Sequence, residues 1–345
     1  MKLHTAPSFA LASMAVALLA ACSPSEKAAA PAAAGTAAST AASVPALEAK
    51  KIAITAIVEH PALDAARQGV LDELKEQGYE EGKNLTVDFQ SAQGSTANAA
   101  QIAKKFVGDN PDLIVAISTP SAQSALASTK TIPIVFAAVT DPVAAKLVPS
   151  WEQAGANISG VSDLLPLTPQ IDLMKKIVPN VKNIGYVYSP GEVNSTVVLD
   201  ELKEKLTADG INVVAAPAQR SSDVLTAARS LNGKVDVVYT SLDNNVVSQY
   251  ESMYKAAVEM KRPLVAADTG SVERGAVAAL GVNYYDMGRK AGQMAAGVLK
   301  DGKNIADLPP ARMDTLDLFL SKKNAAAVGV TLPEDLLKEA KEVQE

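Results

Sequence analysis

Two short stretches of the sequence end an apolar run in a hydroxyl and a carboxylate. The stretch IPIVFAAVTDP contains Thr140 and Asp141 near its end. The stretch RPLVAADTG contains Asp268 and Thr269 in the same place. A buried carboxylate is costly unless it is paired, and neither acid has a Lys or Arg next to it in the sequence. We expect a cationic group of a ligand to pair with Asp268, and we expect Asp141 to be partly a turn former.

Side chains of the same kind follow most of the other predicted strands. With the four residues above, the candidate ligand-binding set comprises Glu59, Ser118, Thr119, Ser121, Ser162, Asp163, Tyr188, Glu192, Asn194, Ser195, Tyr239, Asp243 and Asn244. The set is rich in hydroxyls and carboxylates and contains no Lys or Arg, which disfavours phosphate and other multiply anionic ligands. Ligands of open α/β sheets bind outside the carboxyl ends of the strands, so we interpret these residues as the walls of a cleft.

The chemistry of this set fits a zwitterionic amino acid. Carboxylates suit an ammonium group, and free backbone N–H groups at the helix starts near Ser121 and Asn194 suit a carboxylate. Tyr188 and Tyr239 lie near strand ends, where they would stack on an aromatic side chain. The sequence therefore predicts an L-amino acid as ligand, aromatic or large and apolar rather than charged.

Each of these residues also has a simpler interpretation. Ser121, Asn194 and Ser195 are good N-cap residues without any ligand. Asp141 and Asp163 would form Asx turns, His60 would be an ordinary loop residue before Pro61, and the two tyrosines would belong to the core. Only the convergence of many such residues at strand ends favours a binding site.

Enzymatic and nucleic-acid-binding functions find little support. After removal of a signal peptide, His60 is the one remaining histidine, and no nucleophile-elbow, G-x-G-x-x-G, Walker A or HExxH motif occurs. The sequence therefore predicts a protein that is not an enzyme and has no cofactor and no metal. A net charge of −6 and a pI near 5.2 leave no basic surplus for nucleic acid.

The N-terminus has the pattern of a bacterial lipoprotein. A short apolar region leads into LAAC, and Cys22 is the only cysteine in the chain. We predict a signal peptide over residues 1–21 and a lipid on Cys22, which would anchor the protein on the outer side of a bacterial membrane. The alternative is an ordinary secretory signal with a chance cysteine. Residues 22–48 are rich in Ala, Pro, Ser and Thr, which predicts a flexible tether.

Short apolar strands alternate with helical patterns from Lys51 onward. Strands are predicted over 51–58, 84–90, 112–117 and 132–139, and again over 183–189, 211–217, 235–240 and 263–267. Helices are predicted over 62–78, 98–109, 122–129, 169–178, 194–210, 223–231 and 246–260. Strands that are apolar throughout and separated by helices indicate parallel sheets covered on both faces. Two such rounds, which weakly resemble each other, predict an α/β fold of two doubly wound, Rossmann-like lobes.

Several motifs give a family resemblance that covers the chain from Lys51 to about Leu337. The segments VEHPALDAARQGVLDELKEQGYEEGKN, PIVFAAVTDPVAAKLV, GANISGVSD, YSPGEVNS and DTGSVERGAVAALGVNYYDMGRKAGQMAAGVL resemble the substrate-binding proteins of ABC transporters, in the family that includes tryptophan- and tyrosine-binding lipoproteins. The resemblance implies a type I periplasmic-binding-protein fold with three crossovers, near 160–166, 282–286 and 304–312. It predicts lobe 1 over 49–162 plus 285–306, and lobe 2 over 163–284 plus 307–345. It also implies a crossing segment over 277–286, a return helix over 287–302 and a final helix over 332–343.

The resemblance also implies partners. We expect a monomer that captures its ligand by closing two lobes and delivers it to an ABC permease with a cytoplasmic ATPase. Two alternatives remain open at this point. The same fold would serve as the ligand-sensing subunit of a signalling receptor, or paired carboxylates would make the chain a hydrolase.

Overall fold

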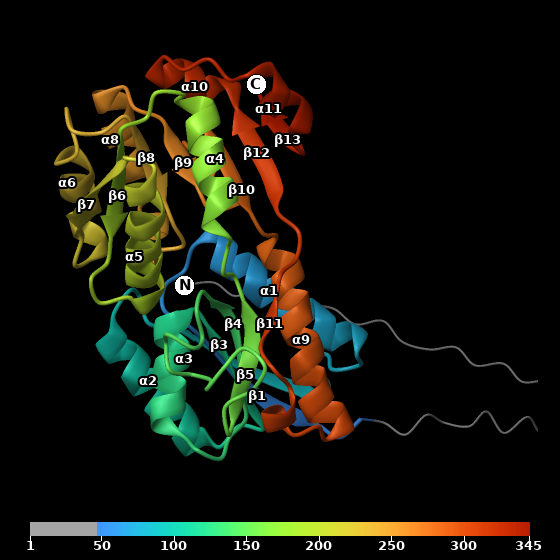
Figure 1. The fold of residues 1–345 in the computed structure, drawn as a ribbon. Helices are drawn as coiled ribbons and strands as arrows, with labels where there is room; N and C mark the ends of the chain where they lie inside the picture. The colour runs from blue at the N-terminus through green and yellow to red at the C-terminus, as the bar shows by residue number, and fades with distance from the viewer. Residues whose placement is uncertain (1–46) are drawn as a thin grey trace, which may run out of the picture. The chain divides into compact units, whose positions relative to one another are not determined.

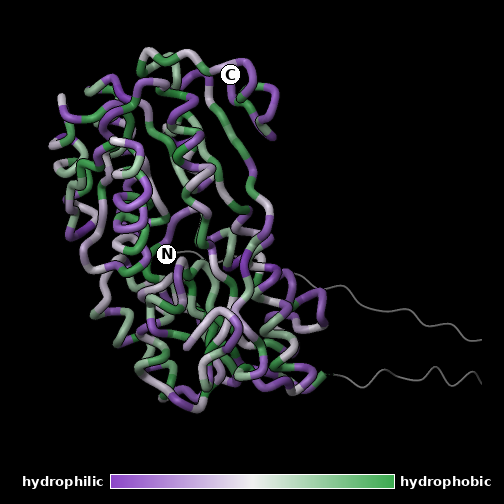
Figure 2. Tube along the Cα trace, viewed as in Figure 1, coloured by the Kyte–Doolittle hydropathy of each residue, from purple (hydrophilic) through white to green (hydrophobic). Residues whose placement is uncertain are grey.

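The computed structural model describes residues 47–345, which form one unit with two β-sheets. Each sheet has helices packed against it, and the two sheets with their helices form two lobes (Figure 1). The lipidation site predicted at Cys22 and the signal peptide lie outside the described residues. Figure 2 shows hydrophobic residues along the inner strands and hydrophilic residues on the outer turns of the helices.

The first sheet has six strands, all parallel, in the order β11-β5-β4-β3-β1-β2. The strands are β1 (Lys50–Ala56), β2 (Leu85–Ser91), β3 (Leu113–Ile117), β4 (Ile134–Val139), β5 (Ile158–Ser162) and β11 (Ala311–Arg312). Every residue of β3, β4 and β5 is buried, as expected for a parallel sheet covered on both faces.

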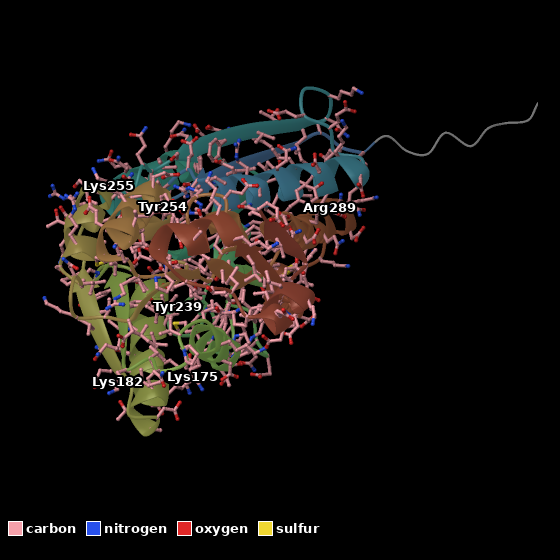
Figure 3. All side chains as sticks on the ribbon, turned by 90° about the horizontal axis from the view of Figure 1, so that it is seen from above. Lys175, Lys182, Tyr239, Tyr254, Lys255 and Arg289 are labelled. Carbon is pink, nitrogen blue, oxygen red and sulfur yellow. The ribbon has the colours of Figure 1, made fainter. Side chains whose placement is uncertain are left out.

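Four helices pack around this sheet: α1 (Pro61–Glu76), α2 (Thr96–Asp109), α3 (Thr119–Ser128) and α9 (Tyr284–Asp301). Helices α1 and α9 approach closely because each has a glycine at the contact. A Cβ built on Gly288 of α9 would lie 2.0 Å from the Ala66 carbonyl oxygen, and one built on Gly69 of α1 would lie 2.2 Å from the Tyr285 carbonyl oxygen. Arg289 on α9, labelled in Figure 3, reinforces the pair by binding Glu73 and Glu76 of α1.

The second sheet has seven strands in the order β13-β12-β10-β9-β8-β6-β7. The strands are β6 (Asn183–Tyr188), β7 (Asn212–Pro217), β8 (Val237–Thr240), β9 (Leu264–Ala266), β10 (Ala278–Gly281), β12 (Asp317–Ser321) and β13 (Glu342–Gln344). All neighbours are parallel except β10 and β12, which pair antiparallel. The predicted α/β fold of two parallel-sheet lobes is therefore confirmed, with one antiparallel pair that the repeat pattern did not indicate.

The remaining helices belong to the second lobe or its connections. They are α4 (Leu167–Ile177), α5 (Val193–Ala208), α6 (Val224–Arg229), α7 (Asn244–Ser248), α8 (Tyr250–Met260), α10 (Lys322–Val328) and α11 (Glu334–Glu339). Three short 3₁₀ turns cover Ser221–Asp223, Thr269–Ser271 and Ile305–Asp307. The predicted helix 246–260 is interrupted at Gln249, where the backbone leaves helical geometry.

Two predictions for the C-terminal part are wrong. Residues 332–343 do not form one final helix, because the chain ends as β13, which pairs with β12. The short strand β11 pairs with β5, so residues 311–312 join the first sheet although 307–345 was predicted for the second lobe. We propose that the chain otherwise divides into its lobes at the three crossovers near 160–166, 282–286 and 304–312.

Candidate functional site

The carboxyl ends of strands from both sheets meet at a small cavity. It is lined by His60, Ala62, Leu63, Ala138, Asp163, Leu242, Asn244, Val247, Asp268 and Tyr284. Asp163 follows β5 in the first sheet, whereas Asn244 and Asp268 follow β8 and β9 in the second. Three residues of the predicted set therefore line one cavity, as expected for the carboxyl ends of parallel strands.

The cavity is small in this arrangement. Its volume is about 10 Å³, which is roughly the space for one water molecule. Sites for small organic ligands have volumes of roughly 300–1,000 Å³. A ligand of amino-acid size therefore requires the lobes or the lining side chains to move apart.

Asp163 is the acid with a free oxygen in this cavity. Its side chain is buried, and its Oδ2 accepts a hydrogen bond of 2.9 Å from the hydroxyl of Tyr284. Its Oδ1 is buried without a hydrogen-bond partner. Burial raises the pKa of Asp163 to about 6, and the hydroxyls of Thr140 and Tyr284 offset part of that rise. Asp163 is therefore a binding candidate and not only a turn former.

Asp268 also lines the cavity, but its own turn engages both of its oxygens. Oδ1 accepts from the backbone N–H of Gly270 at 3.1 Å, and Oδ2 accepts from the Ser271 hydroxyl at 2.9 Å. Burial raises the pKa of Asp268. Asp268 therefore lies just after the end of its strand and lines the cavity. Its oxygens have less capacity than those of Asp163 to accept hydrogen bonds from a ligand.

His60 is a cavity residue that the sequence analysis assigned to an ordinary loop. It is the N-cap of α1, and its Nδ1 accepts from the Leu63 N–H at 3.5 Å. Burial, with a contribution from the charge of Arg274, lowers the pKa of His60 to about 3. The imidazole is therefore neutral at ordinary pH. The position before a Pro at a helix start was the available sequence signal for a cap, but it did not reveal the cavity.

Three predicted hydroxyls lie at the start of α3. Ser118, Thr119 and Ser121 are all buried, and their side-chain oxygens have no hydrogen-bond partner among the described residues. Ser118 has a φ of 82°, a left-handed conformation that a non-glycine residue rarely adopts. The strain and the unpaired hydroxyls both suggest a ligand-binding role for this helix start rather than simple capping.

The start of α5 presents a similar arrangement from the second lobe. Asn194 and Ser195 are buried, and the Asn194 Oδ1 and Ser195 Oγ have no partner in the described part of the chain. Helices α3 and α5 contact each other, so these two polar helix starts come from different lobes and lie close together. Neither Ser121 nor Asn194 or Ser195 is the N-cap, because the caps are Ser118 and Glu192.

Two buried acids, Glu192 and Asp243, form a hydrogen-bond network beside Asn244, which lines the cavity. Glu192 Oε2 accepts from the Asn194 side chain at 3.0 Å and from the Asn244 side chain at 2.7 Å. Asp243 caps α7 and also accepts from the N–H and hydroxyl of Ser189. Burial, followed by the charge of Asp243, raises the pKa of Glu192. This network positions Asn244 toward the cavity.

Other predicted residues lie apart from the cavity lining. Asp141 accepts from the N–H groups of Val143 and Ala144, so it forms the turn that was the simpler interpretation. Ser162 donates to the Thr140 carbonyl at 2.8 Å and thereby joins β5 to the end of β4. Glu59 is exposed, and Thr269 is half-buried in the 3₁₀ turn.

The two predicted tyrosines do not line the cavity. Tyr239 and Tyr188 each stack on Tyr186, with ring centroids 6.2 Å and 6.4 Å apart. Tyr239 is fully buried within the second lobe, where Figure 3 labels it. The structure gives Tyr239 a core role in place of the predicted stacking on a ligand, and Tyr188 packs against the same core.

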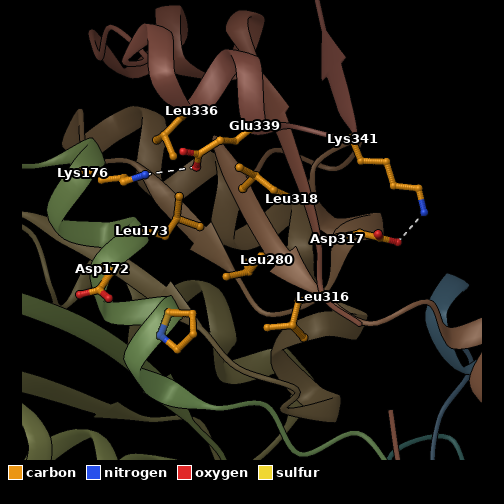
Figure 4. A pocket seen from close by; sticks show the side chains of 11 residues that line it. Asp172, Leu173, Lys176, Leu280, Leu316, Asp317, Leu318, Leu336, Glu339 and Lys341 are labelled. Carbon is orange, nitrogen blue, oxygen red and sulfur yellow. Dashed lines mark hydrogen bonds and ion pairs between the residues drawn. The ribbon is translucent and has the colours of Figure 1, made fainter. Parts of the chain in front are cut away.

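A larger cavity of about 510 Å³ lies elsewhere in the second lobe, between α4, β12 and α11 (Figure 4). Its floor consists of leucines such as Leu173 and Leu318, and its rim carries the ion pairs Lys176–Glu339 and Lys341–Asp317. No predicted site residue lines it. Within residues 47–345, no cluster of His, Cys, Asp and Glu could hold a metal ion, and no helix is long and apolar enough to span a bilayer.

The chain is similar in sequence and fold to several known proteins. The family model described as "ABC transporter substrate binding protein" matches residues 51–344. A tyrosine-binding protein of Clostridioides difficile is 43% identical over 279 residues, which cover 81% of each chain.

Two solved structures are also similar. An ABC domain from Streptococcus pneumonia in complex with L-Trp has a TM-score of 0.82 and 33% identity, covering 86% of this chain and 100% of that one. The ligand-free, open structure of a substrate binding protein with adhesive properties from Clostridium difficile has a TM-score of 0.64 and 43% identity, covering 86% and 99%. This chain therefore superposes better on the L-Trp complex than on the ligand-free, open structure, although its identity to the former is lower.

Proposed function

The chain belongs to the substrate binding proteins of ABC transporters, and from that premise we propose that it captures an aromatic L-amino acid between its two lobes. Members of this family bind ligands and are not enzymes, so the hydrolase alternative is set aside. The single observation that carries the ligand class is the 43% identity to a tyrosine-binding protein over 81% of both chains. The similarity to an L-Trp complex supports the same class.

The cavity and the start of α3 together offer groups that suit the ammonium and the carboxylate of an amino acid. Asp163 and Asp268 are the two buried acids of the cavity lining, and Asp163 Oδ1 is free to accept from an ammonium. The start of α3 offers the hydroxyls of Ser118 and Thr119 with a helix N-terminus, which is a favourable place for a carboxylate. We therefore assign the ammonium first to Asp163, and we give Asp268, the acid favoured by the sequence, a supporting role.

An apolar wall remains for the side chain. Leu63, Leu242 and Val247 line the same cavity from both lobes. Opening of the lobes would enlarge this small space between apolar surfaces. Closing onto an aromatic ring, with the lining side chains further apart than in this arrangement, would bury the ring there. Burial of a large aromatic side chain removes roughly 150–250 Å² from water, which would favour the closed form.

The proposed cellular role follows from the family. We propose that the protein works on the extracytoplasmic side as a monomer, held to the membrane by lipid on Cys22. It would pass its ligand to an ABC permease driven by a cytoplasmic ATPase. The predicted lipoprotein motif supports the anchor.

Calorimetric titration of the purified protein with individual amino acids tests the proposal, after any co-purified ligand has been removed and identified by mass spectrometry. L-Trp or L-Tyr should bind, whereas indole-3-propionate, which lacks the ammonium, should bind at least tenfold more weakly. Asp163→Asn should weaken binding more than Asp268→Asn. Tight binding of sugars or of charged amino acids instead would contradict the proposed ligand class.

A further inference from the structure

Asp163 Oδ1 is a buried carboxylate oxygen of the cavity for which no hydrogen bond forms in the described part of the chain. The nearby Thr140 hydroxyl does lower the pKa of Asp163, together with Tyr284, but it supplies no positive charge. Asp163 is 3% exposed, and its Oδ1 is buried without a hydrogen bond. The other oxygen, Oδ2, is held at 2.9 Å by the Tyr284 hydroxyl. A buried, unpaired carboxylate oxygen is unfavourable, because its lost hydration is not replaced. The site is therefore built to receive a proton or a cationic donor at Oδ1.

The charged groups around Asp163 do not supply that donor. The cavity contains a second acid, Asp268, whose oxygens are already engaged, and His60, whose lowered pKa keeps it neutral. Arg274, whose charge acts on His60 and Asp268, is paired with Glu251 and donates to the Val247 carbonyl. Tyr284 and Thr140 contribute hydroxyls only. No cationic side chain lines the cavity among residues 47–345.

Asp163 and Tyr284 both lie where the chain crosses between the two lobes. Asp163 directly follows the last residue of β5, where the chain leaves the first sheet for α4 of the second lobe. Tyr284 is the first residue of α9, where the chain returns from β10 to the first lobe. The Asp163–Tyr284 hydrogen bond therefore joins two crossovers of the hinge at the wall of the cavity.

We propose that Asp163 and Tyr284 form a hinge pair in which Asp163 Oδ1 binds the ligand's ammonium and Tyr284 is a positioning residue that holds the carboxylate between two crossovers. This inference deepens the proposed function and rests on it for the identity of the ligand. Below about pH 6, a proton occupies Oδ1 of the ligand-free closed protein in place of the ammonium. Binding then exchanges that proton, which leaves for solvent, for the charged amino group, and the carboxylate becomes ionised.

Competition between proton and ammonium sets the pH dependence. Burial raises the pKa of Asp163 to about 6 in the closed form, so the fraction of closed protein with an ionised carboxylate falls about tenfold between about pH 7.5 and about pH 5. The affinity for an ammonium ligand should fall by the same factor. Protonation removes the cost of burying the charge, so acid should favour closure without ligand. His60 remains neutral over this range.

Titration calorimetry with L-Trp at these two pH values tests the exchange. The wild type should bind about tenfold more weakly at the lower pH, with net proton release detected by repeating the titration in buffers of different ionisation enthalpy. Asp163→Asn should bind weakly at both pH values with no such difference. Tyr284→Phe should shift the midpoint of the affinity profile upward, because the hydroxyl stabilises the ionised form. Tyr285→Phe is the matched control: its hydroxyl bonds Asp72 on α1, so the midpoint should stay in place.

Small-angle scattering of the ligand-free protein tests the effect of pH on closure without any ligand. The wild type should be more compact at about pH 5 than at about pH 7.5, and Asp163→Asn, which resembles the protonated acid, should be compact at both. A wild-type affinity that does not change with pH, or ligand-free dimensions that are the same at both pH values, would overturn the inference while leaving the proposed ligand in place. Failure of L-Trp and L-Tyr to bind would instead refute the proposed function, and scattering would still decide the role of Asp163.

Discussion

Replacement of His60 by Asn isolates the effect of one buried titration on stability. His60 is 8% exposed, caps α1 through Nδ1, and is the only histidine among the described residues. Asn is a strong N-cap residue, so His60→Asn keeps the cap and removes the titrating group. At about pH 7.5 the histidine is neutral in both the folded and unfolded states, and the two proteins should differ only by packing.

The magnitude follows from the pKa of His60, which falls from 6.5 to about 3 on folding because the imidazole is buried. A depressed histidine pKa means that the unfolded chain binds the proton first, so stability is lost as the pH falls below 6.5. At about pH 4.5 this loss covers two pKa units, or about 3 kcal/mol of unfolding free energy. The His60→Asn protein should be spared this loss. The opposite trend from Asp163, whose raised pKa adds stability as the pH falls, is common to both proteins and cancels in the comparison.

Urea denaturation of both proteins at the two pH values measures how the difference between their unfolding free energies changes with pH. His60→Asn should gain about 3 kcal/mol relative to wild type on moving from neutral to acidic pH, and the denaturant slope should stay the same. Equal pH dependence in the two proteins would mean that His60 titrates normally in the folded chain. The conclusion that it is buried and neutral would then be wrong.

The remaining predictions concern packing and anchoring. Gly288→Ala should destabilise the protein by about 2 kcal/mol or more in urea denaturation, because the new Cβ would meet the Ala66 carbonyl oxygen at 2.0 Å. Gly108→Ala is the matched control in α2: its Cβ meets nothing within 4 Å, so it should be neutral or stabilise by up to about 1 kcal/mol, and an equal loss in both variants would contradict the packing argument. Cys22→Ser should move the protein out of the membrane fraction or leave an uncleaved precursor, and normal membrane retention with normal processing would refute lipidation.

The sequence by itself determined the fold class and part of the cavity. Apolar runs of strand length separated by amphipathic helices specify buried parallel strands, because only a sheet covered on both faces accommodates such runs. Since the carboxyl ends of parallel strands share one edge, the polar residues after the strands were expected to lie close together, and Asp163, Asn244 and Asp268 do line one cavity. Their role in binding stays a prediction.

Only the tertiary structure decided which side chains reach the cavity. Strands buried on both faces show no alternation of polar and apolar residues, so the sequence could not tell that Tyr239 points into the core of its lobe. His60 caps α1 and lines the cavity, whereas its neighbour Glu59 is exposed, and the sequence did not show which of the two would turn inward. Tyr284 meets Asp163 across 121 positions of sequence, and β13 pairs with β12 through a contact between separate segments. Such contacts arise from the assembled fold and leave no local pattern in the chain.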